Sequence, residues 1–140
     1  MPIHSIKLKG PWTVYWRPDG AAAPGHNPCT VHLPLNARSL FGDASGTAEF
    51  ERRFNRPTGL SSRHRVCLRL TGVTELLGIR INGVLLPSES DCNGTHVVDL
   101  TEFLNPHNLL AVEVRMSPRE PADVPTGLWQ PVVLEIEEPD

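Results

Sequence analysis

The sequence predicts an all-β fold, a β-sandwich of about eight short strands in two antiparallel sheets. Apolar and polar residues alternate with a period of two in one segment after another, whereas helical periodicity hardly appears. The 14 prolines and 11 glycines fall between these segments, where they separate short elements. Each segment has one apolar face, which is what antiparallel sheets packed on a shared core require.

The alternating segments define the expected core. In GPWTVYW, Trp12, Val14 and Trp16 share one face, so we expect both tryptophans to be buried. In TAEFERRF the apolar face also carries a charge, Arg52. Four more segments show the same period: RVCLRL, LGIRINGVLL, LAVEVRM and VVLEIE. Their expected inward residues are Val66, Leu68 and Leu70; Leu77, Ile79, Ile81, Val84 and Leu86; Leu110, Val112, Val114 and Met116; and Val132, Leu134 and Ile136.

Turns and connections complete the predicted architecture. Asn82 and Gly83 suit a hairpin turn that requires positive φ. The only helical segment is LTEFL, where Thr101 is expected to cap a single turn. The stretch from Arg17 to Pro34 is rich in Pro, Gly and Ala and is predicted to be a long surface connection. No domain boundary is evident, so residues 1–140 are expected to form one domain.

Composition argues against several classes of protein. The net charge is −3 and no cluster of Lys or Arg occurs, which argues against nucleic-acid binding. No apolar stretch is long enough to span a bilayer, so no membrane association is expected. The three cysteines (Cys29, Cys67 and Cys92) lack C-x-x-C spacing and, with no signal peptide visible, predict free thiols in the cytoplasm. A secreted protein trimmed of its signal peptide would present the same sequence.

No catalytic or metal-binding constellation is visible. The six histidines lack the close spacing of zinc ligands, so neither a metal nor another cofactor is expected. Two pairs of glutamates share a strand face, Glu49 with Glu51 and Glu135 with Glu137. A glycosidase needs two carboxyls about 5–10 Å apart in a pocket. Neighbours on a solvated strand face are usually surface charge, so the chain is not expected to be an enzyme.

Two regions could contact a ligand. In the polar loop SESDCNGT, Asp91 and Asn93 suit turn geometry but could also offer hydrogen bonds to a sugar, as could His96 just beyond. Trp129 stands where a loop enters the last strand, and an exposed indole there could stack on a sugar ring. The alternatives, a turn for the loop and a core position for Trp129, remain open.

Five segments, in order, resemble the N-terminal sugar-binding domain of family 2 glycoside hydrolases, the β-galactosidase and β-glucuronidase family. They are LKGPW, VHLPLNARSLFGDASGTAEFERRFNRP, VCLRLTGVTELLGIRINGVLL, VVDLTEFLNPHNLLAVEV and PTGLWQPVVLE. The second segment resembles a passage ending in Y-x-R-x-F-x-x-P. Matching residues are Pro34, Phe50, Arg53, Phe54 and Pro57; Gly72, Val73, Asn82 and Gly83; Asp99, Thr101, Leu104, Asn108, Leu110, Val112 and Val114; and Gly127, Trp129, Val132 and Leu134.

The resemblance implies a galactose-binding-domain-like jelly roll and a non-catalytic carbohydrate-binding module. In the family, the catalytic carboxylates lie in a separate barrel domain, and an acidic residue before the G-x-W segment reaches toward it; Asp123 lies in the corresponding stretch. Gln130 departs from the family's arginine after Trp129. The alternative function is a structural or protein-interaction domain without sugar binding. Expected partners are a carbohydrate, another protein or a glycosidase catalytic domain, and the candidate sugar contacts are Asp91, Asn93, His96, Asp123 and Trp129.

Overall fold

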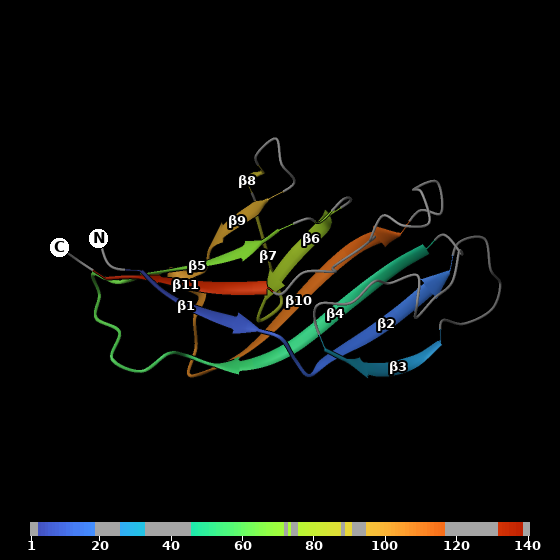
Figure 1. The fold of residues 1–140 in the computed structure, drawn as a ribbon, viewed down its shortest axis with the longest axis horizontal. Helices are drawn as coiled ribbons and strands as arrows, with labels where there is room; N and C mark the ends of the chain where they lie inside the picture. The colour runs from blue at the N-terminus through green and yellow to red at the C-terminus, as the bar shows by residue number, and fades with distance from the viewer. Residues whose placement is uncertain are drawn as a thin grey trace.

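The fold consists of two antiparallel β-sheets packed face to face (Figure 1). The computed structural model describes residues 3–18, 26–32, 46–71, 73, 76–87, 89–90, 95–116 and 132–138. The five-stranded sheet has the order β1 (Ile3–Leu8), β11 (Val132–Glu137), β5 (Arg65–Leu70), β9 (His96–Asp99) and β8 (Glu89–Ser90). The six-stranded sheet has the order β3 (His26–Val31), β2 (Trp12–Pro18), β4 (Gly46–Asn55), β10 (His107–Met116), β6 (Leu76–Ile81) and β7 (Val84–Leu86). The predicted sandwich of antiparallel sheets is confirmed.

The structure contains more strands than the sequence predicted. Eleven are described instead of about eight. One of them, β3, lies inside the stretch from Arg17 to Pro34, so the prediction of a continuous surface connection there was wrong. Pro28 falls within β3, which is the edge strand of its sheet. A proline is tolerated at an edge because no neighbouring strand needs its missing N–H.

The core lies between the two sheets and follows the predicted alternation. Trp12 and Trp16 are 0% and 3% exposed, as predicted. The indole Nε1 of Trp12 donates a hydrogen bond to the Leu8 carbonyl at 2.8 Å. This bond links β1 to β2 where the chain passes from one sheet to the other, through a cis Gly10–Pro11 peptide. The indole therefore joins the two sheets through both its packing and its polar atom.

Strand β6 departs from the predicted pattern at its start. Leu77 is 53% exposed, so its predicted inward orientation was wrong, whereas Ile79 and Ile81 are buried. The pairing of β6 with β10 contains a register shift between Glu113 and Val114, which leaves Leu76 opposite Val114. A β-bulge of this kind turns the extra residue out of the alternation. Beyond the hairpin, Leu86 is buried as predicted, but Val84 is exposed.

The first and last described strands are neighbours. β1 pairs with β11 along its full length, with Ile3 opposite Glu137, so the two chain ends lie at the same end of the sandwich (Figure 1). Cys29 and Cys67 are free thiols, as predicted, and Cys92 lies outside the described residues. None of the described helices has the length and apolar character needed to cross a membrane.

Candidate functional site

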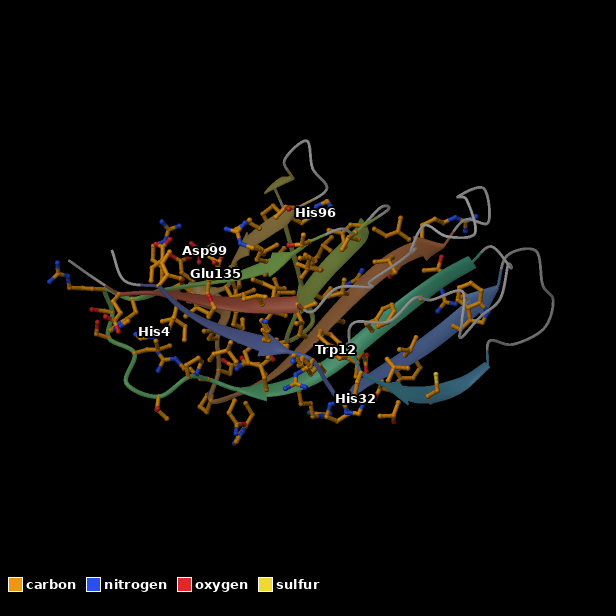
Figure 2. The ribbon with its side chains drawn as sticks, in the orientation of Figure 1. His4, Trp12, His32, His96, Asp99 and Glu135 are labelled. Carbon is orange, nitrogen blue, oxygen red and sulfur yellow. The ribbon has the colours of Figure 1, made fainter. Side chains whose placement is uncertain are left out.

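Of the candidate sugar contacts, only His96 belongs to the described residues; Asp91, Asn93, Asp123 and Trp129 lie outside them. His96 begins β9, opposite Leu70 of β5 and Ser90 of β8 (Figure 2). It has the parity of the buried Val98, which directs the half-buried imidazole to the inner side of the sheet. Its Nδ1 is buried and has no hydrogen-bond partner. This nitrogen therefore has unused hydrogen-bonding capacity.

The asparagine turn of the resemblance forms as predicted. Asn82 and Gly83 connect β6 to β7 with φ angles of 52° and 84°. The side chain of Asn82 also binds other elements. Its Nδ2 donates to the Phe103 carbonyl at 3.2 Å and to Asn108 Oδ1 at 3.0 Å, while its Oδ1 accepts from the Leu109 N–H at 2.9 Å. Asn82 thus holds a hairpin, a helical turn and β10 together.

Asn108 completes this arrangement from β10. It is 3% exposed and is the one polar residue classed as buried in the described part of the chain. Its Oδ1 accepts from the Asn105 N–H at 2.8 Å, and its Nδ2 donates to the Asn105 carbonyl at 2.9 Å. We call Asn82 and Asn108 the asparagine pair. Because both side-chain amides form their hydrogen bonds within the fold, these two motif residues stabilise the scaffold.

Asp99 and Thr101 form a second internal cluster. Asp99 Oδ1 accepts from the Thr101 N–H at 2.9 Å and from the Thr101 hydroxyl at 2.6 Å. The Thr101 hydroxyl in turn accepts from the Val66 N–H at 2.9 Å. The 3₁₀ helix η1 (Thr101–Phe103) begins at Thr101, and Leu100 occupies the N-cap without a side-chain bond, so the predicted Thr101 cap was wrong. The threonine hydroxyl is engaged by β5 and by Asp99 instead.

A surface hollow of about 630 Å³ lies beside this cluster. Its lining includes two carboxylates, Asp99 and Glu102. Asp99 also pairs with Arg65, whose Nη2 lies 2.9 Å from Oδ2. Burial alone would raise the pKa of Asp99, but the hydrogen bonds from Thr101 and Arg65 hold this pKa below its ordinary value. A general acid needs the opposite shift, so the Asp99 carboxylate, which Thr101 and Arg65 hold in its ionised form, is not suited to the role of general acid.

The paired glutamates lie on outer sheet faces, as predicted. Glu135 accepts from Arg69 Nε at 2.6 Å on the outer face of the five-stranded sheet (Figure 2). Glu49 stands opposite Glu113 on the six-stranded sheet. Burial, then the charges of Glu51 and Glu113, raise the pKa of Glu49. Partial burial on the sheet, together with repulsion from neighbouring carboxylates, accounts for this shift.

Arg52 was predicted on the apolar face of β4, and the structure confirms that parity. It stands between the buried Phe50 and Phe54, opposite the buried Leu110 of β10. Its Nε is buried without a hydrogen-bond partner. The alternating pattern predicted this charge on an apolar face, but Arg52 was not among the predicted site residues. That mismatch of charge and face was the signal that could have identified it.

Comparison with solved structures finds similar folds within glycosidases. A Ruminococcus gnavus β-glucuronidase matches with a TM-score of 0.75 at 15% identity, over 96% of this chain and 28% of that one. A putative β-galactosidase from Bacteroides fragilis matches with a TM-score of 0.74 at 18% identity, over 99% and 24%. A rhamnosidase from Novosphingobium sp. PP1Y matches with a TM-score of 0.73 at 21% identity, over 98% and 15%. No family model matches the chain, and no curated protein sequence does.

These matches establish a class of fold, a β-sandwich that occurs as part of larger glycosidases. The resemblance to family 2 glycoside hydrolases is confirmed at the level of the fold. The chain spans well under a third of the length of each of these three proteins, 15% to 28%. The pattern Y-x-R-x-F places its arginine two residues after the aromatic position. Counted from Phe50, that arginine is the inward Arg52, so its assignment to Arg53 is corrected.

Proposed function

We propose that residues 1–140 form one non-catalytic carbohydrate-binding domain that accompanies a glycosidase catalytic domain. One observation carries this proposal: nearly the whole chain matches the fold of one part of several larger glycosidases. By their names, these are a β-glucuronidase, a putative β-galactosidase and a rhamnosidase. A shared fold does not dictate a shared ligand, so the sugar contacts need independent support.

That support comes from His96. Sugars are recognised mainly by directional hydrogen bonds, which require protein groups that are not already paired within the fold. His96 lies on the strand that follows residues 91–94; its imidazole is only half-buried, and its Nδ1, which is buried, has no hydrogen-bond partner within the fold. We propose that His96 acts with Asp91, Asn93, Asp123 and Trp129 to bind the sugar.

The described carboxylates support the non-catalytic part of the proposal. Asp99 and Glu135 are held in ion pairs with arginines, and the pKa of Asp99 is lowered. Glu49, whose pKa is raised, lies on an outer sheet face beside other glutamates. We therefore expect no turnover of aryl glycosides by the isolated chain, measured against a buffer blank.

The test is a titration of the ¹⁵N-labelled chain with a panel of mono- and oligosaccharides. We expect amide shifts near residues 95–97, with millimolar to high-micromolar affinity, because each hydrogen bond nets only about 0.5–1.5 kcal/mol. His96→Ala and Trp129→Ala should weaken binding. His4→Ala is the matched control, because His4 is exposed on β1 and pairs with Glu138. Silence across the panel at millimolar sugar would contradict the proposal.

A second candidate, a protein-interaction domain, is favoured by exposed apolar residues on the β6–β7 hairpin. Leu77, Val84 and Leu85 are all strongly exposed there, and β7 is the edge strand of its sheet. Apolar groups beside an open strand edge suit a protein partner better than a sugar. Association with a glycosidase catalytic domain that is lost on Leu85→Asp, in a chain silent toward sugars, would favour this candidate.

A further inference from the structure

A hollow of about 560 Å³ opens between the two sheets, on the side of β1 and β11. Ile6, Leu8 and Leu134 line it from the five-stranded sheet, and Arg52 and Phe54 line it from the six-stranded sheet. Ile6 has the inward parity of the buried Leu8 and yet is 42% exposed. The six-stranded sheet therefore leaves part of the inner face of β1 uncovered. The volume lies within the range of about 300–1,000 Å³ that is typical of small-ligand sites.

Arg52 is an inward-facing charge in this hollow and has no ion-pair partner among the described residues. Strand parity directs it inward with Phe50 and Phe54, and its Nε is buried without a partner. None of the ion pairs among the described residues involves its guanidinium. Burial lowers the pKa of Arg52, which reflects incomplete compensation of its charge. A half-buried cation without a counterion is costly, so an anion in the hollow would be stabilised.

The uncharged polar side chains of the described lining already have hydrogen-bond partners within the fold. The side-chain amide of Asn108 forms hydrogen bonds with Asn82 and with the backbone of Asn105. His107 Nδ1 lies 3.0 Å from Asn55 Oδ1. The described lining contains no Asp or Glu, and its second charged residue is another cation, Arg53. The hollow thus combines apolar walls with positive charge.

We propose that this hollow binds a small amphipathic carboxylate, with the carboxylate paired to the Arg52 guanidinium and the apolar body lying against Ile6, Leu8 and Leu134. A guanidinium can bind a carboxylate through two parallel hydrogen bonds, which fixes the orientation of the ligand. This site is separate from the proposed sugar contacts around His96, and either can fail without the other.

The test uses octanoate as the probe and 1-octanol as its uncharged counterpart, each titrated into the ¹⁵N-labelled chain. We expect octanoate to shift the amides of Ile6, Leu8, Phe54 and Leu134. It should bind at least about tenfold more tightly than octanol, because a charge-assisted hydrogen bond contributes more than a neutral one. This comparison uses the wild-type chain only, so it holds even where a variant fails to fold.

Variants assign the carboxylate contact. Arg52→Gln should lower octanoate affinity about ten- to a hundredfold and leave octanol unaffected. The matched control, Arg63→Gln, removes the same charge from an exposed turn and should change neither. The proposal would be overturned if octanoate and octanol bound equally well, or if octanoate did not bind at millimolar concentration. It would also be overturned if acetate bound the site as tightly as octanoate and displaced it. The last outcome would indicate an adventitious ion only.

Discussion

Asn108 and Arg52 lie on paired strands of the same sheet, and both line the hollow between the sheets. They differ in whether their polar atoms have hydrogen-bond partners within the fold. Asn108 is almost fully buried and has internal partners for both its oxygen and its nitrogen. Arg52, opposite Leu110, carries a full charge and has none for its buried Nε. The fold thus satisfies one inward polar group completely and leaves its neighbour unpaired.

This difference separates scaffold from site. Buried polar groups that serve the fold are paired within it, and each unpaired one requires an explanation. By this criterion, Asn82, Asp99, Thr101 and Asn108, which carried much of the family resemblance, are scaffold residues. Among the residues that the structure describes, Arg52 and His96 each have a buried nitrogen without a hydrogen-bond partner. The motif match therefore predicted the fold, and most of its polar residues serve the scaffold; Arg52 is the motif residue that does not.

The largest expected effect is at Asn108. Asn108→Ala removes one of the two hydrogen bonds of Asn82 Nδ2 and leaves the Asn105 N–H and carbonyl without their side-chain partner, at a position that is 3% exposed. We expect the free energy of unfolding to fall by about 3 kcal/mol in urea titrations. Asn55→Ala is the matched control, because Asn55 is exposed and its bond is to the His107 side chain. A loss at Asn108 no larger than at Asn55 would mean that the asparagine pair is not structural.

The second-largest effect is expected at Asn82, where Asn82→Ala should lower the free energy of unfolding by about 2 kcal/mol. The alanine loses the side-chain bonds and is also strained at a φ of 52°. Asn82→Gly removes only the bonds, since glycine tolerates this φ. Urea titrations of both variants separate the two causes. If the glycine variant is as stable as wild type, the bonds to Phe103 and Asn108 contribute nothing.

Asp99 should have a smaller, pH-dependent effect. Its folded-state pKa is lowered, so the ionised carboxylate stabilises the fold above the pKa of the unfolded chain, about 3.9, and this contribution is lost as the pH falls through the folded-state value. The carboxylate is largely exposed, so we expect Asp99→Asn to cost less than about 1 kcal/mol at neutral pH. The difference from wild type should shrink below about pH 4. A difference that grows with acidity would have the wrong sign.

The sequence predicted the sandwich and most of its core because a period of two leaves one face per strand apolar. The sequence did not predict the features that depend on how strands pair with their neighbours in the sheet. Leu77 broke the pattern because of a bulge in the pairing of β6 with β10, and β3 was hidden by Pro28, which only an edge position tolerates.

The candidate site was less predictable than the fold. Asp91, Asn93, Asp123 and Trp129 lie outside the described residues, in parts of the sequence without periodic alternation of apolar and polar residues. Whether an asparagine serves the scaffold or a ligand depends on contacts across the sequence, such as Asn82 with Asn108, that no local pattern encodes. The sequence did place Arg52 on the apolar face, but the absence of a counterion became visible only in three dimensions.

The most direct test of the contrast between scaffold and site is the unfolding free energy of Arg52→Leu relative to wild type, from urea titrations without added ligand. Leucine keeps an apolar side chain against Phe50, Phe54 and Leu110 and removes the unpaired charge. We predict that stability stays the same or rises, by up to about 1 kcal/mol, because the charge is uncompensated in the free chain. A fall of more than about 2 kcal/mol, comparable to the loss at Asn108, would show that Arg52 is scaffold and would contradict the account.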